Sequence, residues 1–166
     1  MNSTRQGTAH IFGDNINTDI ISPPQYMELS AQEAAQYAMS SVDPDLASRV
    51  TPGDIIVAGK NFGSGSSREL APLSLKHLGV GAIIAKFFAR IFYRNAINLG
   101  LPVVECAETD NIKPGDRLTV DFAAGTIRNE TRSETYACST LPPHILALVQ
   151  KGGLIAHLKE QRAAKT

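Results

Sequence analysis

The chain has 166 residues, of which 43% are hydrophobic, which suffices for one packed domain but not for two of ordinary size. Basic and acidic residues number 16 each, so the net charge of zero provides no overall field that would attract nucleic acid or an anionic membrane. The sequence has no apolar targeting segment at its start and no apolar run of membrane-spanning length, so we expect a soluble, cytoplasmic protein without membrane partners.

The N-terminal part alternates short apolar runs with turn-forming residues. An apolar start at Ala9–Phe12 leads into a polar loop, and Ile20–Ile21 then predicts a short strand that Pro23–Pro24 ends. Ser30–Met39 begins with a serine that is followed three residues later by glutamate, the pattern of a helix N-cap. We therefore expect a helix over Ser30–Met39.

The middle of the chain predicts a βαβ arrangement. Ile55–Ala58 is apolar throughout, as in a strand buried on both faces, and a glycine-rich loop follows it. The later elements are expected in the order helix, strand, helix and strand: Ala71–Leu78, Val80–Ala85, Phe88–Leu99 and Leu101–Val104. Gly79 and Gly100 are placed to end the two helices. Strands joined by helices in this way indicate a parallel sheet.

The last third changes character. Leu118–Phe122 and Ile127–Ala137 flank the turn Ala124–Gly125 and predict a β-hairpin, before a final helix at Ile145–Gln150. The predicted fold is an α/β body with an added antiparallel layer, in one domain over residues 1–166. The sequence shows no internal repeat or low-complexity tract.

The glycine-rich loop, KNFGSGSSRE over Lys60–Glu69, lies where a buried strand ends and a helix begins. Open α/β sheets bind ligands at that place. Glycines such as Gly65 allow the backbone to approach a ligand closely, and the N–H groups at a helix start favour an anion. Arg68 adds a planar fork that matches a carboxylate.

The same segment has a plainer interpretation, because Ser66 and Glu69 fit the S-x-x-E capping box that merely starts a helix. The two interpretations are compatible, since orphan N–H groups at a helix start can also stabilise an alkoxide. A Walker loop, a dinucleotide fingerprint and a serine-hydrolase elbow all need glycine or lysine positions that this loop lacks.

Metal binding is not expected in this chain. Cys106 and Cys138 lack CxxC spacing, and the four histidines show no metal-binding pairing. Reduced thiols are the favoured state, with a disulfide as the alternative. Asp14, Asn17 and Asp19 hint at a calcium loop, but the glycine and glutamate that complete an EF-hand are missing, which leaves a turn as the simpler interpretation.

Three motifs in order closely resemble the swivel domain of the aconitase superfamily, and within it the small subunits of isopropylmalate isomerases. They are Asn17–Ile21, Gly59–Glu69 and Ala85–Pro102, and Pro52–Val57 matches the approach to the second. Each motif alone is weakly specific, whereas their order and spacing across most of the chain are highly specific. The resemblance implies a swivelling β/β/α three-layer domain with a mixed sheet.

The resemblance also implies a subunit that works only with a larger one, as a heterodimer or heterotetramer. The large subunit of such enzymes carries a [4Fe–4S] cluster, so none is expected on this chain. The implied reaction interconverts 2-isopropylmalate and 3-isopropylmalate in leucine biosynthesis, by removing and re-adding water through isopropylmaleate. The alternatives are a related 2-alkylmalate hydro-lyase (methylmalate/citraconate, dimethylmalate or homoaconitate type) and a non-catalytic anion-binding module.

Site residues follow from the resemblance position by position. Ser66 matches the family's catalytic base, which removes a carbon-bound proton. Ser67 matches a substrate-contacting serine, Arg68 matches the arginine that holds a substrate carboxylate, and Gly65 is expected to bind substrate beside them. Asp19 matches the aspartate of the T-D-x-I segment, with an orienting role, although a turn-forming aspartate is an equally simple explanation.

Two features depart from the family pattern. Leu70 stands where many relatives have histidine or glutamine. Tyr26, Met27, Glu28 and Leu29 fall in the segment that distinguishes the substrate side chain in this family. Met27 and Leu29 could contact an isopropyl group, whereas Glu28 would repel the third carboxylate of homoaconitate unless it points to solvent.

Overall fold

The computed structural model describes residues 3–164, which form a sheet covered on one side by helices. Among these residues the sheet has seven strands in the order β4-β3-β2-β1-β5-β6-β7. The strands are β1 (Thr4–Ile11), β2 (Ile55–Val57), β3 (Ala82–Ala85), β4 (Val103–Glu105), β5 (Arg117–Asp121), β6 (Thr126–Asn129) and β7 (Glu134–Ala137). β1 to β4 run parallel, whereas β5, β6 and β7 continue from β1 in antiparallel fashion. The sheet is therefore mixed, as predicted.

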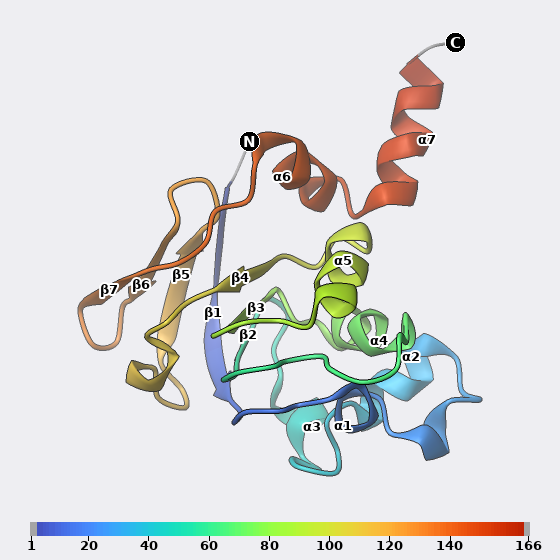
Figure 1. The fold of residues 1–166 in the computed structure, drawn as a ribbon, viewed down its shortest axis with the longest axis horizontal. Coiled ribbons are helices and arrows are strands. Elements are labelled where there is room, and N and C mark those ends of the chain that lie inside the picture. Colours follow the sequence, from blue (N-terminus) through green and yellow to red (C-terminus); the bar gives the residue numbers. More distant parts are fainter. Residues whose placement is uncertain (1–2, 165–166) are drawn as a thin grey trace.

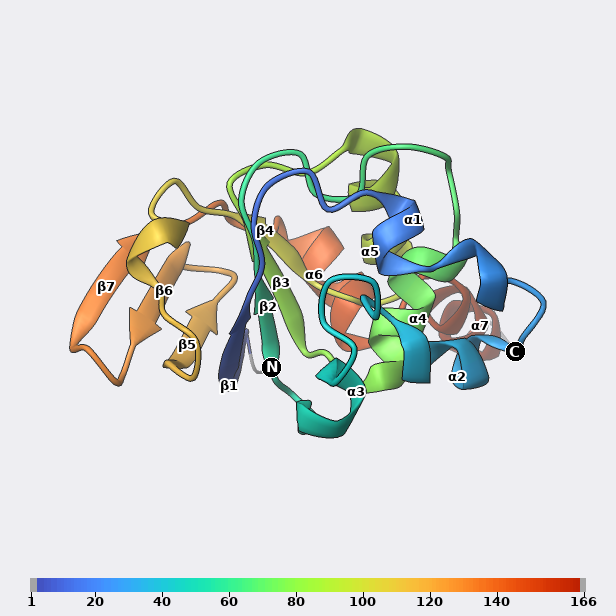
Figure 2. The same cartoon turned by 90° about the horizontal axis from the view of Figure 1, so that it is seen from below.

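Strand β1 joins the two halves of the sheet. Its first part, residues 4–8, pairs with β5, and its last part, residues 9–11, pairs with β2. Figure 2 shows the outcome as three layers, with β5–β7 on one side, the parallel strands in the middle and the helices on the other side. This arrangement confirms the expected β/β/α order of layers.

The helices lie between and after the strands in the sequence, and most of them are short. They are α1 (Thr18–Ile21), η1 (Pro24–Tyr26), α2 (Ala31–Ala34), η2 (Ala35–Tyr37), α3 (Leu46–Arg49), α4 (Leu70–Leu78), α5 (Arg90–Asn98), η3 (Thr109–Asn111), α6 (Pro143–Gln150) and α7 (Leu154–Ala164). Figure 1 shows α7 extending away from the sheet. Within residues 3–164, no helix has the length and apolar character needed to cross a membrane.

Several local predictions are confirmed. Ser30 caps α2, because its hydroxyl accepts a hydrogen bond from the Glu33 N–H at 3.2 Å. Gly79 ends α4 with a φ of +106°, a conformation that glycine adopts without steric cost. The helix predicted over Ser30–Met39 is confirmed only in part, because the structure divides it into α2 and the 3-10 helix η2. Strands β2 and β3 are buried along their whole length, and the apolar run Ile55–Ala58 had predicted this for β2.

Three elements differ from the prediction. Ile20–Ile21 lies in helix α1 and not in a strand, because the Asn17 side chain accepts a hydrogen bond from the Ile20 N–H at 2.9 Å and caps the helix. The stretch Ile127–Ala137 is two strands, since the chain turns between β6 and β7 with Ser133 at a φ of +55°. Helix α7 follows α6, although the sequence analysis predicted no helix after Gln150.

A buried carboxylate anchors the antiparallel layer. Asp116 is 3% exposed, and its Oδ2 accepts hydrogen bonds from Asn129 Nδ2 (2.8 Å), Arg132 Nε (2.8 Å) and the Lys113 N–H (2.9 Å). Burial raises the pKa of Asp116, but the hydrogen bonds from Asn129, Lys113 and Arg132 outweigh it and lower the pKa below the usual value. The ionised carboxylate is therefore favoured in the folded state.

We expect Asp116→Ala to reduce the free energy of unfolding by about 1–3 kcal/mol at pH 7, because three donors lose a charged acceptor. A lowered pKa stabilises the fold fully above the unfolded-state value of about 3.9, and this contribution is lost as the pH falls through the folded-state pKa. Urea unfolding of both proteins at several pH values checks this. Glu130→Gln, in the exposed turn after β6, is the control, and an equal loss in both variants at pH 7 would contradict the anchoring role.

Candidate functional site

A cavity of about 200 Å³ lies between the glycine-rich loop, the start of α1 and one face of α5. Its lining residues are Thr18, Gly63, Gly65, Ser66, Ser67, Arg68, Ala89, Arg90, Ile91, Phe92 and Asn95. The loop follows β2, and α1 follows β1, so the cavity lies beyond the carboxyl ends of parallel strands. This is the place where open α/β sheets bind ligands.

Main-chain hydrogen bonds fix the glycine loop against the segment after β1. The Gly63 N–H donates to the Ile16 carbonyl at 2.7 Å, and the Thr18 N–H donates to the Ser64 carbonyl at 2.8 Å. Gly65 has a φ of +102°, and a Cβ there would lie 3.2 Å from the Thr18 hydroxyl oxygen. The first and second sequence motifs are therefore one structural unit, which holds the serines at the cavity.

Gly63 is the point where the loop meets α5. It has a φ of +84°, and a Cβ there would lie 2.3 Å from the Phe92 ring. Phe92 is 2% exposed and packs edge-on against Phe62, with 5.2 Å between the ring centroids. The third sequence motif thus supplies the opposite wall of the cavity, and only glycine allows the approach.

We expect Gly63→Ala to lower the free energy of unfolding by about 2–4 kcal/mol, since it combines a left-handed backbone strain with overpacking against the Phe92 ring. Thermal or urea unfolding measures the loss. Gly13→Ala is the matched control, because a Cβ at Gly13 would meet nothing within 4 Å and its φ is not positive. Comparable stability of the two variants would show that the loop can shift away from α5.

The two serines are not helix caps. Helix α4 begins at Leu70 with Glu69 as its N-cap, and no side chain caps it, so the S-x-x-E box predicted as the plainer interpretation does not form. Ser66, Ser67 and Arg68 all precede the helix. The loop before α4 is instead hydrogen-bonded to the segment around α1, through Thr18 N–H and the Ser64 carbonyl.

The loop leaves several hydrogen-bond donors available to a ligand. Gly65, Ser66 and Ser67 are exposed. Among the hydrogen bonds that join residues 3–164, none uses the backbone N–H of these three residues as its donor. Unpaired N–H groups beside hydroxyls suit a carboxylate or a developing oxyanion.

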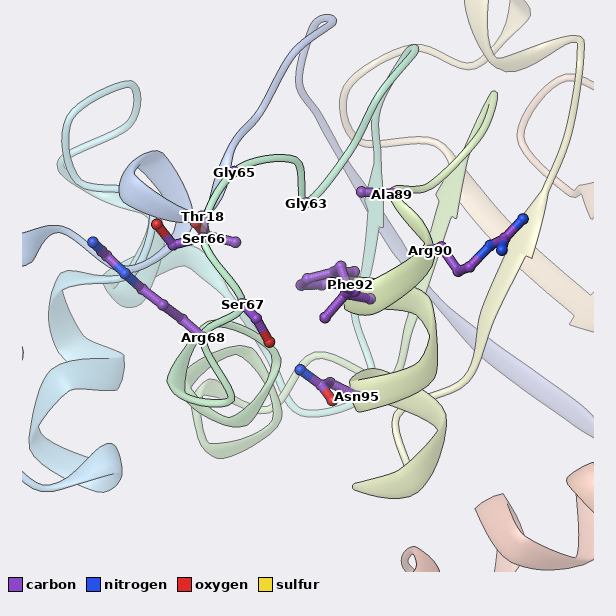
Figure 3. Close-up of a pocket in the computed structure, with 11 residues that line it drawn as sticks. Thr18, Gly63, Gly65, Ser66, Ser67, Arg68, Ala89, Arg90, Phe92 and Asn95 are labelled. Atoms are coloured by element: carbon purple, nitrogen blue, oxygen red, sulfur yellow. The ribbon is translucent and has the colours of Figure 1, made fainter.

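Arg68 and Asp19 form an ion pair beside the cavity. Arg68 Nη1 lies 2.6 Å from Asp19 Oδ1 and 3.5 Å from the Ser22 carbonyl oxygen. The Arg68 side chain is 20% exposed and that of Asp19 is 57% exposed. Figure 3 shows Arg68 extending to the side of α1, away from Asn95. Asp19 does not line the cavity, and the orienting role expected for it stays a prediction.

The predicted specificity segment lies outside this cavity. None of Tyr26, Met27, Glu28 and Leu29 lines it. The Tyr26 ring stacks on Tyr37 with 3.9 Å between the centroids, which fixes the segment against η2. Met27 is 46% exposed, and Glu28 is exposed to solvent. The assignment of these four residues to the substrate side chain stays a prediction.

The described residues do not fit an iron–sulfur cluster. Residues 3–164 contain no group of three or more histidine, cysteine, aspartate or glutamate side chains that could hold a metal. Cys106 and Cys138 are both free thiols. Burial, with a contribution from Cys106, raises the pKa of Cys138 to about 12, so it stays protonated and is a poor metal ligand.

The cavity includes residues that the sequence did not single out. They are Thr18, Ala89, Arg90, Ile91, Phe92 and Asn95, and five of these six come from the third motif. The motif itself was recognised, but its periodicity alone does not tell which helical face meets the loop. The close contact at Gly63 is the signal that locates this face.

Comparison with known proteins identifies the family of this chain. The family model described as the aconitase C-terminal domain matches residues 4–109, which include the loop, α1 and α5. The class defined by fold and site is therefore the aconitase swivel domain.

The similarity also extends over nearly the whole chain. The 3-isopropylmalate dehydratase small subunit of Wolinella succinogenes is 52% identical over 160 residues, 96% of each chain. The isopropylmalate/citramalate isomerase small subunit of Methanocaldococcus jannaschii is 46% identical over 165 residues, 98% of each chain. A crystal structure of 3-isopropylmalate dehydratase (leuD) from that organism superposes with a TM-score of 0.92 at 40% identity, covering 98% of this chain and 97% of that one. The chain belongs to the family of 3-isopropylmalate dehydratase small subunits.

Proposed function

We propose that this chain is the small subunit of a hydro-lyase that interconverts 2-isopropylmalate and 3-isopropylmalate in leucine biosynthesis. The observation that carries the proposal is the cavity where Ser66, Ser67 and Arg68 meet unpaired backbone N–H groups, on a chain 52% identical to a 3-isopropylmalate dehydratase small subunit. The relatives are named as small subunits, which supports a larger partner.

Each residue of the loop has a distinct role in this proposal. Ser66 removes the proton bound to carbon during elimination and returns it during hydration. Ser67 and the free N–H groups bind a substrate carboxylate, while Arg68 binds with its guanidinium fork. Asp19 holds Arg68 in position. A [4Fe–4S] cluster on the large subunit would supply the Lewis acid that polarises the departing hydroxyl.

Exposure of the site supports inactivity of the isolated chain. Ser66 is exposed to solvent, and a water-exposed serine hydroxyl is far too weak a base to remove a carbon-bound proton. Closure of a partner over the cavity would exclude water and strengthen the donors around Ser66. We place the working assembly in the cytoplasm, as a heterodimer or heterotetramer in which residues 1–166 form one swivelling domain.

A second substrate has specific support. The Methanocaldococcus jannaschii relative is named an isopropylmalate/citramalate isomerase, so a small alkyl group is the chief alternative to isopropyl. Citraconate is the alkene acid that corresponds to citramalate. Because Glu28 is solvent-exposed here, its charge does not by itself select among these acids.

The test is hydration of isopropylmaleate and of citraconate, followed as a loss of alkene absorbance. Each acid is given to the chain alone, to the cluster-bearing large subunit alone and to the two mixed anaerobically. We expect turnover only in the mixture, with isopropylmaleate preferred. Turnover of citraconate only would assign the smaller substrate, and turnover of neither acid would overturn the proposed reaction. Size-exclusion chromatography of the mixture gives the stoichiometry.

A further inference from the structure

Helix α5 presents one polar group to the cavity, the amide of Asn95. Of the other α5 residues that line the cavity, Ile91 and Phe92 are apolar, and Figure 3 shows Arg90 pointing away. Asn95 lies three residues after Phe92, so the two side chains share a helical face. Phe92 is 2% exposed and packed against Gly63, which fixes the direction of that face. The amide is therefore held toward the glycine loop.

The Asn95 amide is free to bind a ligand. Within residues 3–164 its side chain has no hydrogen-bond partner, although it is only partly exposed. Figure 3 shows it directed toward the Ser67 hydroxyl across the cavity. The backbone N–H groups of Ser66 and Ser67 are also unpaired. An asparagine amide offers two N–H donors, so the two walls together present mainly donors to the space between them.

Ser67 and Arg68 are neighbours in the chain, but their side chains point to different sides of the loop (Figure 3). Arg68 extends toward α1, where it pairs with Asp19, and the Ser66 hydroxyl points to the same side, whereas Ser67 faces Asn95 on α5 (Figure 3). An alkylmalate has two carboxylates. One guanidinium on the α1 side leaves the second carboxylate to be bound on the α5 side, by neutral donors.

We propose that Asn95 is a substrate-binding residue, which donates a hydrogen bond from its amide to the carboxylate that lies opposite Ser67. This inference rests on the proposed function, because the ligand is the dicarboxylic acid of that reaction. It adds a residue of the third motif to the site and makes α5, with the loop, a determinant of how the substrate is oriented. The proton transfer at Ser66 does not pass through Asn95.

The test compares Asn95→Ala and Asn95→Asp with Asn98→Ala and Asn98→Asp, which change the same residue type on the same helix outside this cavity. Each variant is mixed with the large subunit, and KM and kcat are measured for the acid that the wild-type mixture turns over. A lost hydrogen bond to a charged group raises KM for Asn95→Ala by about 10-fold to 100-fold, with kcat changed far less. Asn95→Asp raises KM further, because its carboxylate repels the substrate.

Both Asn98 variants keep the wild-type KM, and melting temperatures and co-elution with the large subunit report on folding and assembly. Wild-type KM in Asn95→Ala, or equal rises in the Asn95 and Asn98 variants, would overturn the assignment while leaving the proposed function intact. A wild-type mixture that turns over neither acid would overturn the reaction itself, and the assignment with it.

Discussion

Ser66→Ala is expected to lower kcat of the assembled enzyme by about 10²–10⁴-fold, the usual contribution of a positioned acid–base group. The chain should fold as before, because Ser66 is exposed and does not cap α4. The reduction arises in the chemical step, so KM should change little. Steady-state hydration of the preferred alkene acid by the reconstituted pair measures both constants.

Ser64→Ala is the control for this result, since Ser64 belongs to the same loop but does not line the cavity. Its backbone carbonyl, which accepts from the Thr18 N–H, is kept in the variant. We expect nearly wild-type kcat for Ser64→Ala. If Ser66→Ala instead retains wild-type turnover, then Ser66 is not the base.

The position of the loop could be predicted from the sequence because it depends on local patterns. An unbroken apolar run such as Ile55–Ala58 indicates a strand buried on both faces, and a glycine-rich stretch directly after it indicates a loop. Gly79 likewise ends α4 as predicted, because a left-handed cap needs little beyond the glycine itself.

The rest of the site depends on contacts between distant segments. Ile20 and Ile21 have the side chains of a strand, yet the Asn17 cap and the hydrogen bond from Thr18 to Ser64 place them in α1. Asn95 enters the cavity only because α5 packs its Phe92 face against the loop. Local sequence propensity predicts neither the helix at Ile20–Ile21 nor the place of Asn95, since each depends on a contact with another motif.

Arg68→Lys is expected to raise KM by about 10-fold to 100-fold with a smaller effect on kcat, because lysine cannot reproduce the two parallel hydrogen bonds of the guanidinium fork. In the structure, Nη1 of Arg68 already contacts Asp19, so the rest of the fork remains for a carboxylate. A lysine has a single ammonium group, so when it pairs with Asp19 it has no second, coplanar N–H group to bind the substrate carboxylate. KM and kcat of the reconstituted pair test this.

Arg94→Lys is the matched control, since Arg94 is exposed on α5 and does not line this cavity. Folding should be preserved in both variants, because Asp19 is more than half exposed and an ion pair of that kind contributes little to stability. A rise in KM confined to Arg68→Lys identifies the fork as a substrate contact. Equal kinetics in the two variants would mean that Arg68 only ties the loop to α1, and the α1 side of the cavity would then hold no carboxylate.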